Sequence, residues 1–391
     1  MTGYKWPLMK NTLTFGDRWN LAKFVMTTDR FTQGKKVEEF ENAWSNWLGA
    51  KHSLFVTSGS TANFLLLDAV RDFYFKNKKD VKVLLPACTW VTNINPVIQL
   101  GMTPVFCDIN LENYSFDVEN MMSIAKKHEI DIVFTTHLLG LPANKRQIQS
   151  IFPNAILLDD VCESHGTFDE WEETKIGANS EGATFSFYFG HHMSTVEGGM
   201  ISTNNMELYD FMRMKRSHGM SRVSMDPQSY ITLNPDIDPQ FLFVTAGYNF
   251  RNTELGAVLG LSQLKKLDEF IRIRRKNYYR YQEIMEKTDL FHVPLNDDCN
   301  SSFCFPFIAK KKVTKEILID ILSYAGVEYR PIVGGNLLRQ PYMKGHKIAC
   351  KKAPYNVDVL HENGIYIGNN QFVGDKEMDL LEKSIGELNE Q

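Results

Sequence analysis

The chain has 391 residues, of which 43% are hydrophobic and 23% charged, and its formal net charge is −4. A chain of this length and composition buries one large core and a smaller one, as globular proteins do. The weak negative charge gives no electrostatic reason to expect nucleic acid as a partner, and no apolar run approaches the ~18 residues of a membrane span.

Two further absences in the sequence narrow the class of protein. Residues 1–11 lack the apolar core of a signal peptide, so we expect a cytoplasmic protein. No two cysteines form a C-x-x-C pair, which argues against a disulfide framework and against a zinc site, and we predict no bound metal. The cysteines are Cys88, Cys107, Cys162, Cys299, Cys304 and Cys350.

The first elements expected along the chain are two helices, Asp17–Met26 and Lys35–Leu48, the second ended by Gly49. A polar loop with the sequence DRFTQG joins them. By itself this loop predicts only a connection between helices.

Between residues 52 and 203, short apolar strands alternate with helices. Because the strands are apolar on both faces, we expect a mostly parallel sheet covered by helices on both sides, which is the α/β class. The expected strands are His52–Val56, Val81–Leu85, Thr103–Cys107, Ile130–Thr135, Ala155–Asp159, Ala183–Ser186 and Met200–Thr203. The expected helices are Phe64–Phe75, Asn93–Leu100, Val118–Lys127 and Asn144–Ile151.

A long helical pattern, from Asn252 toward Met285, leads into the last part of the chain. The elements expected there form a small α+β domain. We therefore predict a large domain over residues 1–270 and a small C-terminal domain over residues 271–391. The elements of the small domain are Cys304–Ala309, Glu328–Pro331 and Gly364–Gly368 as strands, and Thr314–Ala325 and Asp375–Asn389 as helices.

Three segments at strand ends carry groups suited to a ligand. TSGSTAN, Thr57–Asn63, begins a helix with Gly and hydroxyl residues, and helix N-termini attract anions. A helix cap that binds nothing is the alternative. Trp90 follows a strand, where it belongs to the core or offers a flat surface to an aromatic ligand. LLDDVCESHG, Leu157–Gly166, places two acids after a strand, where burial without a partner would be costly.

The stretch TFSFYFGHHMSTVEGG, Thr184–Gly199, is the most unusual part of the sequence. It predicts an apolar strand, a bend at Gly190 and a Gly-Gly pair that returns the chain into a second strand. Two adjacent histidines occupy the bend. We expect a functional role for them, because imidazole exchanges protons near neutral pH.

These motifs, in this order over nearly the whole chain, resemble the sugar aminotransferase and dehydratase family of the DegT/StrS type, which has fold type I. The resemblance implies pyridoxal 5'-phosphate (PLP) and pyridoxamine 5'-phosphate (PMP) as cofactors. It implies that Asp160 pairs with the pyridine nitrogen, that Glu163 lies near the phenolic oxygen where many relatives carry Gln, and that Trp90 stacks on the ring. The implied phosphate contacts are Gly59, Ser60 and Ser186.

Further matches concern the substrate and a second subunit. GYNFRNTELGAVLG, Gly247–Gly260, resembles a family segment whose Asn reaches the phosphate bound by the neighbouring subunit. The resemblance thus gives Asn249 this role, in a homodimer with shared active sites. Arginine suits bidentate contact with a diphosphate, although an exposed Arg on a polar loop is the alternative. The implied substrate contacts are Phe31, Thr32, His218, Arg222, Arg251, Glu328 and Arg330.

One departure from the family pattern decides the expected chemistry. Where the family carries the lysine that binds PLP covalently, this chain has His191. The family's sugar 3-dehydratases share this histidine. One kind adds an iron–sulfur cluster and a C-x-C cysteine pair, and this sequence has no such pair. A nucleotide-sugar 4-aminotransferase that uses another base, and a PLP-binding regulator without turnover, are the alternatives.

The resemblance therefore implies a lyase of deoxysugar biosynthesis, in the colitose branch that supplies O-antigen sugars to lipopolysaccharide. The implied substrate is GDP-4-keto-6-deoxymannose, and the implied amino donor is L-glutamate. PMP formed from PLP and glutamate would condense with the 4-keto group, His191 would take the C4′ proton, and the C3 hydroxyl would leave. Hydrolysis would then release PLP, ammonia and a GDP-4-keto-3,6-dideoxy sugar.

Overall fold

The computed structural model describes residues 4–295, 298–310, 312–349 and 355–389. Its largest sheet has seven strands: β1 (His52–Val56), β2 (Lys82–Pro86), β3 (Thr103–Cys107), β4 (Ile132–Thr136), β5 (Ile156–Asp160), β8 (Gly182–Ser186) and β9 (Gly199–Thr203). Their order is β1-β9-β8-β5-β4-β2-β3. The pairs from β8 to β3 are parallel, and β9 is antiparallel to both its neighbours. The prediction of a mostly parallel sheet is confirmed.

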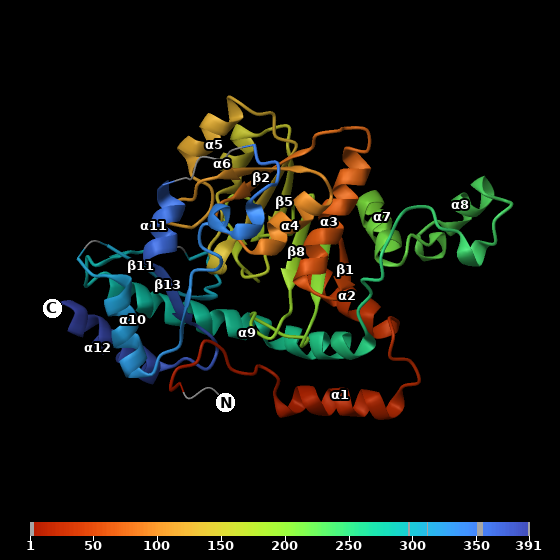
Figure 1. Ribbon diagram of the computed structural model, residues 1–391. Coiled ribbons are helices and arrows are strands. Elements are labelled where there is room, and N and C mark those ends of the chain that lie inside the picture. The colour runs from red at the N-terminus through yellow and green to blue at the C-terminus, as the bar shows by residue number, and fades with distance from the viewer. Residues whose placement is uncertain (1–3, 296–297, 311, 350–354, 390–391) are drawn as a thin grey trace.

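Helices cover both faces of this sheet (Figure 1). One face packs against α3 (Gly59–Tyr74), α4 (Val91–Gln99) and α7 (Met206–Arg216), and the other against α2 (Lys35–Leu48), α5 (Val118–Ala125) and α6 (Lys145–Ile151). Successive side chains of a strand point to opposite faces of the sheet, which explains why both faces pack against helices. In β2, Val83 and Leu85 join the cluster under α3 and α4, whereas Leu84 joins the cluster under α5.

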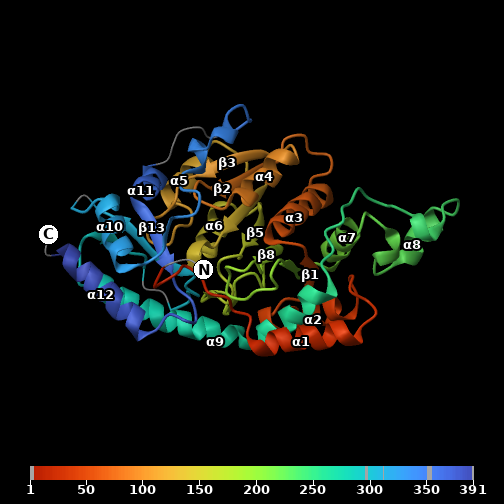
Figure 2. The same ribbon diagram turned by 60° about the horizontal axis from the view of Figure 1, so that its bottom comes forward.

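The long helix α9 (Glu254–Met285) connects the large sheet with a second, four-stranded sheet (Figure 2). That sheet is antiparallel, with the order β10-β11-β13-β12. The division predicted at residue 270 falls within α9, and the division into domains stays a prediction. The strands are β10 (Phe291–His292), β11 (Cys304–Ala309), β12 (Tyr329–Pro331) and β13 (Gly364–Gly368), accompanied by α10 (Lys315–Ala325), α11 (Tyr355–Asn363) and α12 (Asp375–Asn389).

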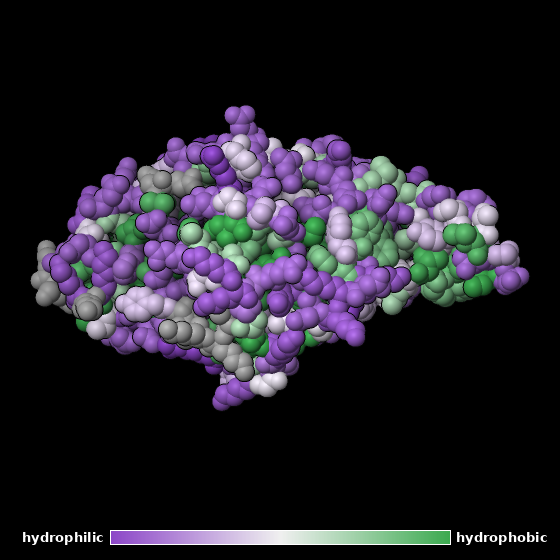
Figure 3. All heavy atoms as spheres, turned by 90° about the horizontal axis from the view of Figure 1, so that it is seen from above, coloured by the Kyte–Doolittle hydropathy of each residue, from purple (hydrophilic) through white to green (hydrophobic). Residues whose placement is uncertain are grey.

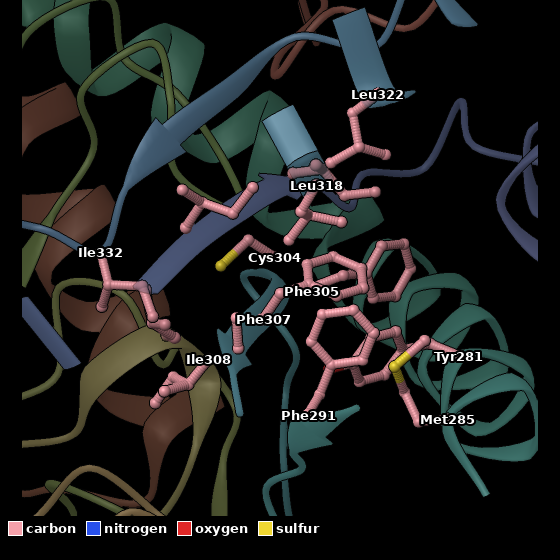
Figure 4. Packing of buried hydrophobic residues seen from close by; sticks show 14 of the residues in the cluster. Tyr281, Met285, Phe291, Cys304, Phe305, Phe307, Ile308, Leu318, Leu322 and Ile332 are labelled. Atoms are coloured by element: carbon pink, nitrogen blue, oxygen red, sulfur yellow. The ribbon is translucent and has the colours of Figure 1, made fainter. Parts of the chain in front are cut away.

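Aromatic packing fixes α9 to the second sheet (Figure 4). The rings of Tyr281 in α9 and Phe305 in β11 are stacked with centroids 5.1 Å apart, and Phe307 meets Tyr281 edge-on at 5.5 Å. Leu318 and Leu322 of α10 belong to the same buried cluster. Burial of such large apolar side chains is the main force that holds this sheet against α9.

The remaining elements lie outside the two sheets. Helix α1 (Phe15–Thr27) lies along α9 (Figures 1 and 2), and β6 (Phe168–Asp169) and β7 (Thr174–Lys175) form a short hairpin. Residues 221–245, which we call the arm, project from the end of α7 and include α8 (Pro227–Leu233). The 3-10 turns are Leu138–Gly140, Ser221–Val223, Pro239–Phe241, Leu337–Arg339 and Pro341–Met343.

Two expectations from composition can be compared with the structure. Within the described ranges, no helix has the length and apolar character needed to cross a bilayer. Cys88, Cys162 and Cys304 are free thiols, and Cys350 lies outside the described residues. In the same part of the chain, no group of three or more His, Cys, Asp or Glu residues is arranged to hold a metal ion.

Candidate active site

A cavity of about 390 Å³ opens at the carboxyl ends of β4, β5 and β8, the edge where α/β sheets commonly bind ligands. The N-terminus of α3 and the loop between β8 and β9 complete its wall. The structure thus brings together predicted residues from four separate motifs. Those that line the cavity are Gly59, Ser60, Trp90, Asp160, Glu163, Ser186 and His191.

The N-terminus of α3 gives the cavity an anion-binding corner. Ser58 caps the helix, and its hydroxyl accepts a hydrogen bond of 3.1 Å from the backbone of Thr61. Gly59 lies against the end of β8, since a Cβ atom added to it would be 2.6 Å from the Cβ of Ser186. Free N–H groups and the helix dipole at this point attract phosphate.

Asp160 is buried at the end of β5 and is held by three donors. The side-chain amides of Asn63 and Asn93 donate to Oδ2 at 3.0 and 2.7 Å. The backbone N–H of Cys162 donates to Oδ1 at 2.9 Å. These donors orient the carboxylate in the cavity wall. Sequence reasoning missed both asparagines, although Asn63 lies within the TSGSTAN motif.

The neighbouring Asp159 points to the other side of the strand and has a structural role. Its carboxylate lies 3.2 Å from Nε2 of His137 and 3.5 Å from Nζ of Lys145. Burial opposes its ionisation, but the charge of Lys145 and the contact with His137 hold the pKa of Asp159 below its usual range. The two adjacent acids therefore separate into one cavity residue and one residue of the buried framework.

Glu163 faces the same cavity from the turn after β5. Its Oε2 accepts a hydrogen bond of 3.0 Å from the backbone N–H of Leu139. Burial raises the pKa of Glu163 to about 7; the Leu139 hydrogen bond opposes this shift and the charge of Asp160 adds to it. Near neutral pH, this side chain is therefore able to donate or accept a proton.

His191 lies in a tight turn between β8 and β9. Its backbone N–H donates to the carbonyl of Tyr188 at 3.0 Å, and a Cβ added to the preceding Gly190 would lie 2.6 Å from the terminal methyl group of Met9. The imidazole lines the cavity, and its Nδ1 is enclosed. Burial, helped by the charge of Arg274, lowers the pKa of His191 to about 4. At neutral pH the ring is uncharged and available as a base.

The adjacent His192 is turned away from the cavity. Its ring is fully buried, and Nε2 lies 3.1 Å from the backbone carbonyl oxygen of Ser301. Only one histidine of the pair thus reaches the space where a ligand would bind.

Three of the predicted residues form a separate group on the surface, outside the cavity. Nε of Arg251 donates to the side-chain oxygen of Asn249 at 3.0 Å, and NH2 of Arg251 lies 3.4 Å from Nε2 of His218. The loop with Phe31 and Thr32 lies beside this group, because the backbone N–H of Glu254, three residues after Arg251, donates to the carbonyl of Phe31. Arg222 is exposed at the base of the arm.

A second cavity, of about 500 Å³, adjoins that surface group. It is lined by five basic residues and two acidic ones. The basic residues are Arg30, Lys35, Arg213, Arg216 and Arg251, and the acidic ones are Glu38 and Glu41.

The last predicted pair, Glu328 and Arg330, lies at the edge of the second sheet. Arg330 pairs in register with Tyr366, which lines the active cavity. The carboxylate of Glu328 accepts a hydrogen bond of 3.0 Å from the backbone of Leu8. The N-terminal segment thereby reaches the cavity, where Met9 forms part of the wall.

Several lining residues were not predicted from the sequence. Cys162, Tyr188 and Glu197 lie within two of the motifs described above, whereas the others come from segments that contact the cavity only after folding. The lining residues that were not predicted are Met9, Thr92, Thr136, Leu138, Cys162, Tyr188, Glu197, Phe303 and Tyr366.

Comparison with known proteins gives a consistent result. The model of the DegT/DnrJ/EryC1/StrS aminotransferase family matches residues 16–376. A curated relative, the GDP-4-keto-6-deoxy-D-mannose 3-dehydratase of Escherichia coli O55:H7, is 33% identical over 369 residues, which are 91% of this chain and 93% of that protein. The protein of the same name from Yersinia pseudotuberculosis is 32% identical over 363 residues, 90% of this chain and 91% of that protein.

Solved structures agree with the sequence matches. The structure of the E. coli GDP-4-keto-6-deoxy-D-mannose-3-dehydratase with bound hydrated PLP has a TM-score of 0.88 and 31% identity, and the match covers 97% of this chain and 99% of that chain. Helicobacter pylori PseC, an aminotransferase, has a TM-score of 0.84 at 22% identity over 98% of this chain and 99% of that chain, which shows a shared fold. The predicted fold type is confirmed.

Proposed function

Because this chain belongs to the DegT/DnrJ/EryC1/StrS aminotransferase family, we propose that it removes the C3 hydroxyl of GDP-4-keto-6-deoxy-D-mannose, with PLP and PMP as cofactors and L-glutamate as amino donor. One observation carries the proposal. His191, which replaces the lysine expected in the family, lies in the wall of the same cavity as Asp160 and the N-terminus of α3. The names of the E. coli and Yersinia relatives state a 3-dehydratase that acts on the same sugar nucleotide.

The residues of the cavity fit PLP. Gly59, Ser60 and Ser186 would bind the phosphate, and a side chain on Gly59 would fill the cradle that they form. The oriented carboxylate of Asp160 would pair with the pyridine nitrogen. Trp90, which is 53% exposed at the cavity, would stack on the ring.

When bound, the cofactor would supply an electron sink that stabilises negative charge next to its ring. The protein would supply the proton transfers. His191 presents a neutral imidazole whose Nδ1 is enclosed, so its Nε2 would accept the proton and return it. A base in this position typically contributes about 10²–10⁴ in rate. No lysine lines the cavity in the described part of the chain, so this wall would hold the cofactor by non-covalent contacts alone.

We further infer a homodimer whose subunits share their active sites. Among the described residues that line the active cavity, none is a lysine or arginine, and Asp160, Glu163 and Glu197 are acids. The phosphate groups of a GDP-sugar need cations for tight binding. A second copy would supply a cation by placing its Arg251 over the cavity, and the amide of its Asn249 would add a hydrogen-bond donor.

Apolar exposure supports this assembly. Hydrophobic side chains gather on the arm, as Figure 3 shows at the right of the view. Such patches commonly mark protein interfaces. The exposed apolar residues of the arm are Met225, Leu233, Ile237, Phe241 and Phe243.

We also propose that the protein is located in the cytoplasm.

Incubation with PLP, L-glutamate and GDP-4-keto-6-deoxymannose, followed by mass spectrometry of the sugar nucleotide, tests the proposal. We expect loss of the C3 oxygen together with release of ammonia. An amino sugar that keeps its C3 oxygen would instead identify a 4-aminotransferase. Unchanged sugar with bound PLP would indicate a regulator and would contradict an enzymatic function on this substrate.

A further inference from the structure

Three histidine rings are buried together behind the wall of the active cavity. The ring of His165, in the turn after β5, lies 5.3 Å from the ring of His192 and 6.2 Å from the ring of His191, measured between centroids. Aromatic side chains surround His165, with the rings of Trp44, Phe185 and Phe187 at 5.6, 5.8 and 5.7 Å. His165 is fully buried and does not line the cavity.

Four of the six ring nitrogens of this cluster lack a partner in the part of the chain that the structure describes. Both ring nitrogens of His165 are buried without a hydrogen bond, and so are Nδ1 of His191 and Nδ1 of His192. A buried polar group without a partner costs about 1–3 kcal/mol. No two of these four nitrogens are hydrogen-bonded to each other directly. A buried water molecule in each gap between neighbouring rings would satisfy them, because buried waters typically bond to such unpartnered polar groups.

The cluster has one hydrogen bond to a group outside it, and this bond determines which nitrogen of His192 carries the hydrogen. Nε2 of His192 lies 3.1 Å from the backbone oxygen of Ser301, which only accepts hydrogen bonds. A neutral His192 must therefore carry its hydrogen on Nε2, which leaves Nδ1 as an acceptor. The backbone N–H of Ser301 is itself bound to Gly140 at 2.9 Å, so this carbonyl has a fixed position.

We propose that His165 is a positioning residue that completes a one-directional chain of hydrogen bonds. In this chain Nδ1–H of His191 donates toward His165, and His165 donates toward Nδ1 of His192, in each case through a bridging water molecule. Nε2–H of His192 donates directly to the carbonyl of Ser301. The chain fixes the hydrogen of His191 on Nδ1 and leaves the lone pair of Nε2 facing the cavity.

The charges around the cluster favour neutral rings. Burial, with the positive charge of Arg274 nearby, lowers the pKa of all three histidines. The other titratable groups next to His191 are Glu163, across the cavity, and Tyr188, at a ring distance of 6.4 Å. A proton taken up by His191 at Nε2 is therefore not shared along the chain, and it is available for return to the ligand.

Nitrogen NMR of full-length protein with isotope-labelled histidine tests the chain directly. We expect His191 to carry its hydrogen on Nδ1 and His192 on Nε2, both before and after PLP is added. We also expect protonation of His191 at low pH to shift the nitrogen signals of His165. An Nε2–H tautomer at His191, or signals of His165 that do not respond, would overturn the inference.

Two substitutions at His165 separate positioning from packing. His165→Phe keeps a flat ring among Trp44, Phe185 and Phe187 but removes both nitrogens, so we expect a mixture of tautomers at His191. Ammonia release should fall roughly tenfold to hundredfold, the loss typical when the partner that orients a metal-binding histidine is removed, with an unchanged KM for the sugar nucleotide. His165→Gln keeps a donor and an acceptor and should recover part of this loss.

Phe185→Leu is the matched control, because it disturbs the packing around His165 and leaves every nitrogen in place. It should lower stability without altering the tautomer of His191. Equal effects of His165→Phe and Phe185→Leu on both readouts would overturn the inference. The catalytic consequence rests on the proposed function, but the tautomers are measured in the resting protein. A protein that never releases ammonia would therefore contradict the function alone.

Discussion

Two titratable side chains in one cavity wall have pKa values that burial displaces in opposite directions. The pKa of Glu163 rises to about 7, and that of His191 falls to about 4. Both shifts favour the uncharged form, as expected where water is scarce. An acid that still holds its proton and a base that has already lost its own then face one ligand near neutral pH, which is the arrangement that acid–base catalysis needs.

The raised pKa of Glu163 predicts a pH-dependent stability. Because the pKa of Glu163 in the folded protein lies above the ordinary glutamate value of 4.5, the folded protein binds an extra proton between these two pH values. The contribution of Glu163 is thus favourable below pH 4.5 and is lost as the pH rises to about 7. Glu163→Gln should be more stable than the parent at pH 8, by roughly 1–3 kcal/mol, and this gain should vanish near pH 4.5.

Urea denaturation at several pH values, without PLP, measures this difference. Glu197→Gln is the control, because it removes an exposed carboxyl from the same cavity. A stability difference between Glu163→Gln and the parent that does not change with pH would contradict the prediction.

The histidine pair gives a second prediction at the residue scale. His191→Lys restores the group that binds PLP covalently in the family, so this variant should keep PLP through dialysis. Ammonia release should nevertheless fall at least ~10²-fold, because the well-placed base is lost. His192→Ala should cost less, since His192 does not line the cavity.

Ammonia release at saturating glutamate and sugar nucleotide compares the two variants. The parent is the control for PLP retention, and we expect it to lose PLP on dialysis. An inactive His192→Ala variant beside a His191→Lys variant of nearly parental rate would show that we have assigned the wrong base.

The sequence identified residues whose role depends on a local pattern. Asp160 follows an apolar strand, and His191 occupies a bend marked by glycine, so both were expected at the sheet edge. His165 and Arg274 gave no such signal. Arg274 is buried inside α9, where its guanidinium donates to the backbone oxygens of Ser302 and Phe303. The sequence shows only one more cation on a helix, because its partners, which include the backbone oxygen of Asn369, lie 28 to 95 residues away.

At the scale of elements, one carboxylate ties α9 to α2 and to the predicted substrate loop. Glu254 is buried at the start of α9, and its oxygens accept hydrogen bonds of 2.9 Å from the backbone N–H groups of Gly34, Lys36 and Val37. Those groups belong to the N-terminus of α2, where a negative charge is favourable. Glu254 therefore takes the place of a local cap, since the cap residue Gly34 has no side chain.

We expect Glu254→Gln to destabilise the protein by about 1–3 kcal/mol. The amide would turn an NH2 group toward backbone donors and leave at least one of them unpaired in a buried site. Limited proteolysis should also cut the loop around Phe31 faster. Urea denaturation checks the first effect, with Glu269→Gln as control on an exposed turn of the same helix. Equal stability of the two variants would contradict this role of Glu254.

Strands and helices of the large sheet were predicted within one or two residues in most cases, because their apolar periodicity reflects burial on a face. Two helices with buried apolar residues, α7 and α11, were missed although they carry that signal. The other missed elements lack it. Helix α8 has no buried residue, and β6 and β7 have two residues each. The N-terminal segment is fixed by Trp6, whose indole N–H donates to the carbonyl of Gly368. A local sequence pattern does not reveal a hydrogen-bond partner that lies so far along the chain.

At the scale of the whole molecule, the described linings of the two cavities carry opposite net charges. The active cavity carries three acids, and within the described lining it has no lysine or arginine. The second cavity carries five basic residues and opens beside Asn249 and Arg251. If each subunit lends its basic surface to the cavity of the other, one site depends on residues from both chains. This arrangement makes a prediction that no single-chain mechanism shares.

Mixed dimers provide that test, because a two-fold dimer exchanges the same surfaces between its subunits. His191→Asn removes the base of the cavity, and Asn249→Ala weakens the contribution from the partner, so each variant alone should be nearly inactive at limiting PLP. In a mixture with random exchange of subunits, half of the dimers are hybrids, and each hybrid has one site with both defects and one site with neither. About a quarter of the sites, and roughly a quarter of the parental activity, should therefore return.

His191→Asn mixed with Asp160→Asn is the matched control: both residues line the same cavity, every hybrid site keeps one defect, and no activity should return. Equal recovery in the two mixtures, or recovery in neither while hybrids form, would contradict shared active sites.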